Sequence, residues 1–584
     1  MLILWQSDGL PWFLVVVLSQ GELSLLRPAA VHRQIPQATA ELAWKVHRHG
    51  TDEMRVRDAL GPLFTDTDFT SGRFAQMYSP LGQPGLSPAL LVMVMILQFR
   101  HNLSDADAAQ AVADRISWKY ALGLDLDDAG FDASVLTELR ARLVTDERAN
   151  ALLDLMLDRL KAAGLARAGG RQRTDSTHVI AGVRRLNRIE TVGETLRAAL
   201  ETIAETSPAW VVPLLEQGWD QRYGRKVETG RLLGRKNASA QALADQIGAD
   251  GAKLLAAIDA DPVAAWMNTL PEVATLRLVW DQQYVTTSTG QLRLKTTDQL
   301  PPAAERVHSP YDTEARYSIK DTGEQPTEWV GSKAHLTESC DEDLPHLVTD
   351  VHTTAATEPD VSATTAIQDK LIARGLAPAQ HLADGGYPSA ENIAASAQRN
   401  ITLVAPVVVQ TGRNARKGTF TPADFSIDWA AGVATCPAGV RSRSMKPDKR
   451  GLVTFAFSRR DCRPCPIRDQ CTLAAEHIAR RITIHPEPIH EARMAAHAAQ
   501  GSEQWRATYN ARAGIEGTIS EAVRGPNLRY ARYRGLAKTH LQNVLSAMAI
   551  NIGRLGAYFD VRPTTPRRPT RIHELCTTYH HAAA

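Results

Sequence analysis

The spacing of apolar residues divides the chain into an all-helical first part and a mixed second part. Residues 37–165 carry apolar positions at helical spacing, and within them Ser87-Pro88 introduces the segment 89–98, which is apolar nearly all round. A helix without a polar face is buried, and Ser followed by Pro is a common start of a helix. Further helices are predicted from Ser104 and from Ser134, because serine favours the position before the first turn. The pattern therefore predicts a helical N-terminal domain.

Strands are predicted beyond the Gly169-Gly170 break. Residues 171–180 follow that break and are rich in β-branched side chains, which predicts a strand. Residues 329–337 and 347–353 are separated by a polar turn and predict a β-hairpin. Helices and strands then alternate, which is typical of a mixed α/β domain. The further elements predicted are helices over 363–374 with Ser362 as cap, from Ser389, over 502–524 and over 540–554, and strands over 381–383 and 401–405.

Two long segments interrupt the mixed part. Residues from about 185 to 305 return to a polar helical pattern with several Gly and Pro breaks, and residues from about 408 to 495 contain four cysteines. Neither continues the pattern of the sheet, so both are predicted to be insertions. The predicted organisation is a disordered or spurious extension over 1–36, a helical domain over 37–165, an α/β domain over 166–560 that contains both insertions, and a tail over 561–584.

Charge is balanced over the whole chain but not along it. The 584 residues include 66 Lys and Arg and 64 Asp and Glu, a formal net charge of +2, so affinity for nucleic acid must come from local clusters. Residues 506–571 form one cluster, with twelve Lys or Arg, three Asp or Glu, and the interleaved Tyr530 and Tyr533. Clustered cations bind phosphate backbones, so this stretch is a candidate for DNA contact. A solvated basic loop is the alternative.

Cysteine content and hydropathy bear on the compartment. Six cysteines in 584 residues are too few for a disulfide scaffold, and four of them fall within 436–471, which suits a metal-binding protein of a reducing compartment. We therefore expect a cytoplasmic location. The apolar run at 14–18 is far shorter than the roughly 20 residues that a spanning helix needs, and no Lys or Arg precedes it as in a signal peptide. No association with a membrane is expected.

Three acidic residues stand where a metal site would need them. Asp175 lies inside a predicted strand, where an unpaired carboxylate is costly to bury. Asp384 ends a strand, and the glycines that follow it would let a phosphate approach closely. Glu516 follows Tyr509 and Arg512 at helical spacing, so these three side chains share one helix face. Cutting DNA at neutral pH is served by two Mg²⁺ ions about 4 Å apart, and Mg²⁺ prefers carboxylate oxygens.

The motifs around these residues resemble those of bacterial insertion-sequence transposases with an RNase H-like DDE core. The first motif is Thr174-Asp175-Ser176-Thr177-His178, the second is Leu382-Ala383-Asp384-Gly385-Gly386-Tyr387, and the third is the spacing Tyr509-x-x-Arg512-x-x-x-Glu516. The likeness runs from about residue 24 to 560. One position departs from it: relatives often carry a lysine seven residues after the glutamate, where this chain has Val523 beside Arg524.

The resemblance implies a fold and an activity. The fold would be an RNase H-like mixed α/β sheet with helices, joined to an all-helical N-terminal domain. The three carboxylates Asp175, Asp384 and Glu516 would hold two Mg²⁺ or Mn²⁺ ions. Water would cleave double-stranded DNA at the ends of the element, and the freed 3′-hydroxyl would attack target DNA without a covalent protein intermediate. A homodimer or higher oligomer on DNA, associated with the nucleoid, is the implied assembly.

Residues near the third motif are predicted to contact DNA. They are Tyr509, Arg512, Arg524, Arg529, Arg532, Arg534 and Lys538, because they lie on or just after the helix that carries Glu516. The basic helices of the N-terminal domain are a second candidate for DNA contact. A role in dimerisation or packing is the alternative for those helices, since they show no sharp helix-turn-helix motif.

The clustered cysteines follow the spacing Cys436-x25-Cys462-x2-Cys465-x5-Cys471. Four thiolates suit a tetrahedral Zn²⁺, so a structural zinc is predicted, with unligated buried thiols and an iron–sulfur cluster as alternatives. Cys340 and Cys576 are expected to be ordinary thiols. The histidines His178 and His335 are predicted to be packed, neutral side chains and not metal ligands.

Two other functions remain compatible with the sequence. A protein that had lost catalysis would still bind the inverted repeats, although the presence of all three carboxylates argues against it. A metal-dependent nuclease would cut DNA without joining it, and the same two-ion site would serve both reactions.

Overall fold

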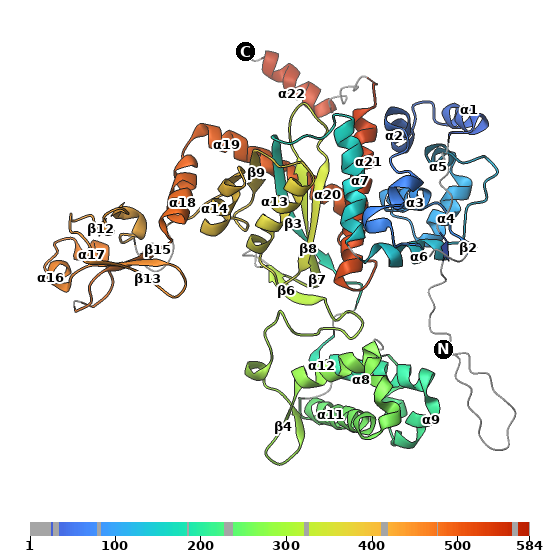
Figure 1. The fold of residues 1–584 in the computed structure, drawn as a ribbon, viewed down its shortest axis with the longest axis horizontal. Helices are drawn as coiled ribbons and strands as arrows, with labels where there is room; N and C mark the ends of the chain where they lie inside the picture. Colours follow the sequence, from blue (N-terminus) through green and yellow to red (C-terminus); the bar gives the residue numbers. More distant parts are fainter. Residues whose placement is uncertain are drawn as a thin grey trace.

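The computed structural model describes residues 25–26 and 34–582, apart from 79–82, 146, 184–185, 227–236, 321–325, 410–417, 476 and 563–569. The predicted N-terminal extension over 1–36 lies almost entirely outside these residues. Figure 1 shows a central sheet with helices on both faces, a helical region on one side, and two lobes that project from the sheet. Within the part of the chain that is described, no helix has the length and apolar character needed to cross a bilayer.

The N-terminal region is helical, as predicted. Ser87 and Ser104 cap their helices, since their hydroxyl oxygens accept hydrogen bonds from the backbone N–H groups of Leu90 and Asp107 at 3.1 Å. A two-residue strand β1 (Leu25–Leu26) pairs with β2 (Gln83–Pro84). The helices are α1 (Gln37–Val46), α2 (Asp52–Leu60), α3 (Pro88–Arg100), α4 (Asp105–Asp114), α5 (Ile116–Leu122), α6 (Ser134–Leu143) and α7 (Arg148–Ala162).

The N-terminal helices and the sheet share one hydrophobic core. The long helix α21 (Leu536–Tyr558) packs against α2, α3 and α7 on one side and against the sheet on the other. A single cluster of buried apolar side chains includes Ile96 of α3, Leu153 of α7, Leu336 of the sheet and Met548 of α21. The helix predicted over 540–554 is the middle of α21, and its apolar face is buried as expected. The N-terminal region is therefore packed onto the sheet.

The central sheet has six strands in a mixed order. Strands β3 (Arg171–Ile180), β6 (Arg316–Lys320), β7 (Thr327–Ser339), β8 (Val348–Ala355), β9 (Gln380–Ala383) and β10 (Thr402–Val404) form it. Across the sheet the order is β8, β7, β3, β9, β10, and β6 pairs with the first part of β7. Strand β7 is antiparallel to β3 and β8, whereas β9 and β10 run parallel to β3. This mixed α/β arrangement confirms the predicted fold class and is consistent with an RNase H-like core.

Helices cover both faces of the sheet. Helices α13 (Ala363–Ala373) and α14 (Ala390–Gln398) lie on one face, and α20 (Gly514–Arg524) and α21 lie on the other (Figure 1). Ser389 caps α14 as predicted, but Ser362 does not cap α13, because its hydroxyl donates to the carbonyl oxygen of Pro359 instead. The single helix predicted over 502–524 is divided into α19 (Glu503–Asn510), a 3₁₀ turn (Ala511–Ala513) and α20.

The first insertion forms a helical lobe with a core of its own. Its buried side chains include Leu196, Trp219, Leu254 and Trp280, and most of its described residues are helical, as predicted. The short hairpin of β4 (Tyr284–Thr286) and β5 (Leu292–Leu294) was not predicted. The helices are α8 (Arg188–Thr206), α9 (Pro208–Val211), α10 (Trp219–Tyr223), α11 (Asn237–Ala260) and α12 (Pro271–Gln283).

The second insertion forms a small β-rich lobe, which we call the cysteine lobe (residues 426–484). Its strands are β11 (Ser426–Asp428), β12 (Val433–Thr435), β13 (Ser444–Pro447), β14 (Val453–Ala456) and β15 (Arg481–Ile484), with the short helices α16 (Arg459–Cys462) and α17 (Arg468–Cys471). Figure 1 shows it at the end of the molecule beyond α14. Helix α18 (Glu487–Ala499) leads from it back to the sheet and packs on α14. Its core of six buried apolar residues, one of which is the preceding Phe425, is separate from the main core.

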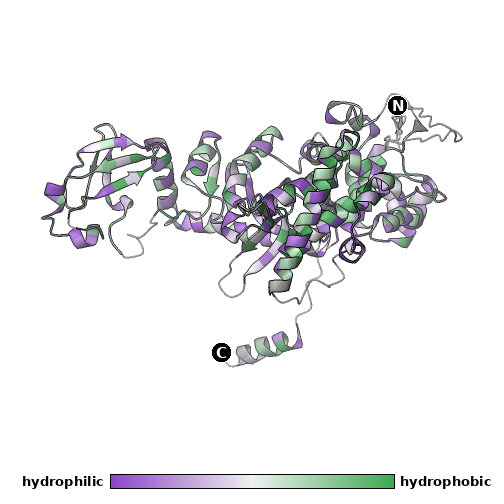
Figure 2. Ribbon diagram, turned by 90° about the horizontal axis from the view of Figure 1, so that it is seen from below, coloured by the Kyte–Doolittle hydropathy of each residue, from purple (hydrophilic) through white to green (hydrophobic). Residues whose placement is uncertain are grey.

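One helix in the C-terminal tail was not predicted. Helix α22 (Arg571–Ala582) has exposed apolar side chains at Ile572, Leu575 and Tyr579. Figure 2 shows it standing clear of the rest of the molecule, while the most hydrophobic ribbons gather in the centre.

Candidate active site

The sheet brings Asp175 and Asp384 together. Strands β3 and β9 are parallel neighbours in which Thr174 pairs with Ala383, so the residue that follows each of them lies at the same level. Asp175 accepts a hydrogen bond from the Ser176 N–H at 2.7 Å, and Asp384 accepts one from the Gly386 N–H at 2.8 Å. Burial raises the pKa of Asp175, and the negative charge of Asp384 raises it further. The two carboxylates are therefore close enough to repel each other electrostatically.

Arg512 connects Asp175 to Glu516. It lies in the 3₁₀ turn before α20, and its guanidinium approaches Asp175 Oδ2 at 3.2 Å and Glu516 Oε1 at 2.7 Å. The Arg512 side chain is 15% exposed, while that of Glu516 is 65% exposed. Arg512 thus stands between the carboxylates of Asp175 and Glu516. Its single positive charge offsets only part of the negative charge of the carboxylates around it.

Tyr509 completes this group of side chains. Burial raises the pKa of its phenol, and the charges of Asp384, Asp175 and Glu516 add to the increase, while Arg512 opposes it. The ring stacks on Trp505, with centroids 4.8 Å apart. The Tyr509, Arg512 and Glu516 side chains that were expected to share one helix face therefore do gather beside the sheet carboxylates, even though the helix is interrupted between them.

A fourth carboxylate, Asp360, lies next to Asp384. A Cβ atom placed on Gly386 would lie 3.1 Å from Asp384 Oδ1 and 3.5 Å from Asp360 Oδ2. Asp360 accepts hydrogen bonds from Lys333 Nζ at 2.9 Å and from the Ser176 hydroxyl at 3.0 Å. Asp360 cannot be singled out in the sequence, because it begins a short 3₁₀ turn between β8 and α13 and its local pattern is that of many surface acids.

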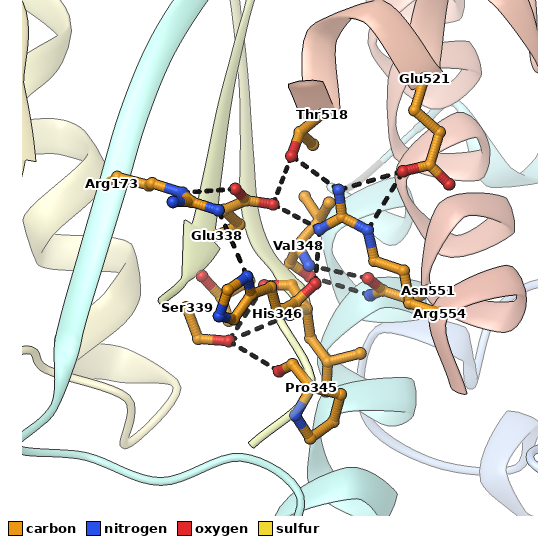
Figure 3. Close-up of polar contacts among 12 residues, drawn as sticks. Arg173, Glu338, Ser339, Pro345, His346, Val348, Thr518, Glu521, Asn551 and Arg554 are labelled. Atoms are coloured by element: carbon orange, nitrogen blue, oxygen red, sulfur yellow. Dashed lines mark hydrogen bonds and ion pairs between the residues drawn. The ribbon is translucent and has the colours of Figure 1, made fainter. Parts of the chain in front are cut away.

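A buried polar network ties the Glu516 helix to the Asp175 strand (Figure 3). At its centre is Glu338 on β7, whose side chain is fully buried. Its carboxylate accepts hydrogen bonds from Arg173 Nε at 2.6 Å, from the Thr518 hydroxyl at 2.6 Å, and from Arg554. Arg173 also donates to the carbonyl oxygen of Ala511 at 2.6 Å, in the turn that carries Arg512. The network therefore joins β3, β7, α20 and α21 directly behind the candidate site.

Like Arg512, two more of the arginines predicted to contact DNA are engaged within the protein. Arg529 donates to the carbonyl oxygen of His178 at 2.8 Å, and Arg532 donates to that of Leu103 at 2.7 Å. Arg532 also lies over the ring of Phe99, so it helps to hold α21 against the N-terminal helices. Among the others, Arg534 lies over the ring of Tyr311, while Arg524 and Lys538 are exposed. Contact with DNA stays a prediction for all of them.

The four clustered cysteines line one cavity of about 30 Å³ in the cysteine lobe. All four are free thiols, and burial raises the pKa of Cys471, with smaller contributions from the other three. Across the described ranges, no group of three or more His, Cys, Asp or Glu side chains is already arranged to hold a metal ion, and this applies to the cysteines and to the three carboxylates alike. Both predicted metal sites therefore stay predictions.

The two histidines singled out in the sequence are packed side chains, and Cys340 and Cys576 are free thiols. Burial lowers the pKa of His178 to about 4 and that of His335 to about 3, so both are neutral near pH 7. Burial raises the pKa of the Cys340 thiol to about 11, and Cys576 is exposed on α22.

Fold and sequence comparison together identify the class of protein. A mixed α/β sheet of this order with a helical N-terminal region is consistent with an RNase H-like transposase core. The family described as "Transposase DDE domain" matches residues 435–556, and the family described as "Transposase domain (DUF772)" matches residues 50–142. These two matches indicate an insertion-sequence DDE transposase. No curated protein and no solved structure matches the chain significantly. Transposases act on DNA, and DDE domains generally use divalent metal ions.

Proposed function

We propose that the protein binds the terminal inverted repeats of an insertion sequence and catalyses metal-dependent cleavage and transfer of DNA strands. The observation that carries this proposal is the convergence of Asp175 and Asp384 on adjacent parallel strands, with Arg512 linking Asp175 to Glu516. The three residues are far apart in the sequence, and acids gathered by chance would seldom meet where the middle of β3 adjoins the end of β9.

The donor set suits a hard divalent cation. Asp175, Asp384 and Glu516 offer only carboxylate oxygens, which Mg²⁺ and Mn²⁺ prefer, and these residues would hold two such ions. Bound there, the ions would activate the attacking oxygen and neutralise the charge that builds on the phosphate. The pKa of Asp175 is raised by burial and, to a smaller extent, by the negative charge of Asp384, and a bound cation would favour the charged form of the carboxyl.

The protein groups around the site position the DNA. Gly385 and Gly386 are exposed and lack side chains, so a sugar-phosphate backbone can approach Asp384 closely. In the cleavage step, the oxygen of water forms a bond to phosphorus and the bond to the 3′-oxygen breaks, which leaves a 3′-hydroxyl. In the transfer step, that hydroxyl attacks a target phosphorus and displaces a 3′-oxygen of the target strand. Arg512 and Tyr509 lie where they can bind the reacting phosphate.

The test is an assay of the purified protein with Mg²⁺ and a duplex that carries the ends of the element. We expect nicks with 3′-hydroxyl ends and, after them, joined products. Nicks without joined products would favour a nuclease, and binding without nicks would favour a protein that only occupies the repeats. Sedimentation of the protein bound to this duplex tests the proposed homodimer or higher oligomer.

Gly514→Ala is expected to lower the rate of strand cleavage by roughly 10- to 100-fold, because a shift of about 1 Å in catalytic groups costs that much. A Cβ atom at Gly514 would lie 1.9 Å from Arg173 Nη1, and Arg173 is held by Glu338 and by the Ala511 carbonyl. The added methyl group must therefore displace Arg173 or the turn that carries Arg512.

The matched control for this change lies on the same helix. A Cβ atom at Gly517 would meet no atom within 4 Å, so Gly517→Ala should keep the wild-type cleavage rate and stabilise the helix by up to about 1 kcal/mol. Single-turnover nicking rates measure both variants. Equal rates for Gly514→Ala and Gly517→Ala would show that the packing of α20 on Arg173 does not position the site.

We further propose that Cys436, Cys462, Cys465 and Cys471 hold a structural Zn²⁺. All four thiols line the same small cavity, and they carry no disulfide. The cysteine lobe has only six buried apolar residues in its core, and folded units of this size usually need a crosslink or a metal. Four thiolates would supply tetrahedral coordination.

Zinc content measures this proposal directly. We expect about one Zn²⁺ per chain in the purified protein, by mass spectrometry of the metal, and a loss of most of it in Cys465→Ser. Cys576→Ser is the control, since Cys576 is exposed and lies outside the lobe. Wild-type protein without zinc would favour unligated thiols, and iron with sulfide would favour a cluster.

A further inference from the structure

The cysteine lobe carries most of the excess positive charge of the chain. Residues 426–484 contain eleven Lys or Arg and five Asp or Glu, a net charge of +6, whereas the whole chain has a net charge of only +2. The remainder of the chain is therefore slightly acidic. A lobe with this charge attracts a polyanion even though the protein as a whole is nearly neutral.

Five of the eleven Lys and Arg residues of the cysteine lobe line one groove, which we call the arginine groove. It has a volume of about 930 Å³, and its described lining includes no Asp or Glu. Glu476, which precedes His477, lies outside the described residues. The basic residues that line the groove are Arg443, Arg459, Arg460, His477, Arg480 and Arg481.

Four of the arginines in this groove are available to a ligand. Arg443, Arg459, Arg460 and Arg481 are exposed, and no ion pair or side-chain hydrogen bond engages them among the residues that the structure describes. Arg480 differs from them, because it is half-buried and donates to the carbonyl oxygen of Phe420 at 2.9 Å. Unpaired guanidinium groups that surround a single concave surface repel one another, and a bound anion relieves this repulsion.

A small sheet holds the arginines in place. The backbone N–H of Arg443 donates to the carbonyl oxygen of Ala456 at 2.8 Å, and Ala456 pairs in register with Arg481. Ser458, which caps α16, accepts a hydrogen bond from the Arg460 N–H at 3.1 Å. The groove therefore has a defined backbone, while its long side chains can adjust to a ligand.

We propose that the arginine groove binds the phosphate backbone of double-stranded DNA at a place separate from the carboxylate site. This inference rests on the proposed function in one respect, since it takes DNA as the ligand. Duplex DNA presents one phosphate per about 1.7 Å of axis, and arginine binds phosphate with two parallel hydrogen bonds. The lining is dominated by arginines, and its one Phe, Phe457, is buried, so the groove is suited to bind the phosphate backbone rather than to read the bases.

The position of the groove in the chain agrees with this role. The family match that includes Glu516 begins at residue 435, so all the groove arginines lie within the same transposase DDE match. Figure 1 shows the cysteine lobe joined through α18 and α19 to the side of the sheet where β9 lies, and the edge strand there is β10, which α19 contacts. DNA that leaves the carboxylate site on this side would meet the lobe. The groove would therefore add affinity along the flanking duplex.

Binding of DNA to full-length variants tests the proposal. The groove variant is Arg459→Gln/Arg460→Gln/Arg481→Gln, and the probe is a fluorescent duplex of about 40 base pairs followed by anisotropy. We expect the groove variant to bind at least about tenfold more weakly at 0.1 M salt, and the slope of log affinity against log salt to fall by roughly two to three, at about 0.9 per lost phosphate contact.

The matched control removes the same charge from the same lobe. Arg441, Lys446 and Lys449 are exposed and do not line the groove, so Arg441→Gln/Lys446→Gln/Lys449→Gln should bind DNA nearly as well as the wild type. Equal losses in the two triple variants would overturn the proposal, because general attraction would then explain the binding. Displacement of the duplex by poly-L-glutamate as effectively as by unlabelled DNA of equal charge would overturn the assignment to DNA.

The binding measurements test the groove separately from the proposed cleavage activity. The groove variant should nick at the wild-type rate once DNA is saturating, since it keeps the three carboxylates. If the wild type binds duplex DNA through the groove but never nicks it, the proposed catalytic function is wrong and the proposed role of the groove is upheld. If the wild type nicks DNA and the groove variant binds DNA as tightly as the wild type, only the proposed role of the groove is wrong.

Discussion

Asp384→Asn is expected to lower the rate of DNA strand cleavage by at least about 1000-fold, or about 4 kcal/mol in the barrier, while DNA affinity changes by less than about twofold. Asparagine keeps the size of the side chain but removes the charge that would neutralise a divalent cation beside Asp175. The Gly386 N–H that now donates to Asp384 can donate to the amide oxygen instead, so the loop should keep its shape. Single-turnover nicking of an end-bearing duplex, with anisotropy of the same duplex, measures both quantities.

A surface carboxylate provides the control for this variant. Asp369 lies on α13 in an exposed ion pair with Arg399 at 2.7 Å, and its side chain is 57% exposed. Asp369→Asn removes one negative charge from the same domain and should leave nicking and joining unchanged, since exposed pairs contribute little. Nicking by Asp384→Asn at the rate of Asp369→Asn would mean that Asp384 takes no part in the chemistry.

Glu338→Gln is expected to destabilise the protein by about 3 to 5 kcal/mol, which is the usual cost of breaking a buried ion pair. The Glu338 carboxylate is fully buried between Arg173 and Arg554, and it also accepts the Thr518 hydroxyl (Figure 3). A neutral amide would leave two guanidinium groups in the interior without a full counter-charge. Chemical denaturation followed by tryptophan fluorescence measures the change in the free energy of unfolding.

An exposed glutamate provides the control, because its substitution removes the same charge without a change in the interior. Glu342 lies 3.6 Å from Arg171, but its side chain is 93% exposed. Glu342→Gln should change the free energy of unfolding by less than about 1 kcal/mol, because solvent screens such a pair. A loss of similar size in both variants would contradict the view that the buried network holds β3, β7, α20 and α21 together.

The elements of the fold followed closely from local patterns. The strand predicted over 171–180, the hairpin over 329–337 and 347–353, and the buried helix after Ser87 are all present with bounds close to those expected. These segments have strong periodicity or clear caps, so neighbouring residues alone determine their structure. The prediction of one helix over 502–524 was less accurate, because a 3₁₀ turn divides it. Arg173, which is distant in the sequence, donates a hydrogen bond to the Ala511 carbonyl in this turn.

The candidate site was only partly visible in the sequence. The motifs around Asp175, Asp384 and Glu516 singled out three residues, and the domain bounds and the roles of these residues stay predictions. Glu338 escaped notice because a charged residue in a strand usually faces solvent, and only its pairing with Arg173 across β3 and β7 shows why it is buried. The arginine groove escaped notice because its members are spread from 443 to 481.

Spacing along the chain was enough to predict many of the helices and strands, the mixed α/β class and the acidic motifs. Which side chains meet depends instead on how the elements pack. The parallel pairing of β3 with β9 sets Asp175 beside Asp384, and the packing of α20 on Arg173 brings Arg512 between Asp175 and Glu516. The physical reason is that strand register and helix packing are chosen by the whole core, whereas a local pattern records only which face of an element is apolar.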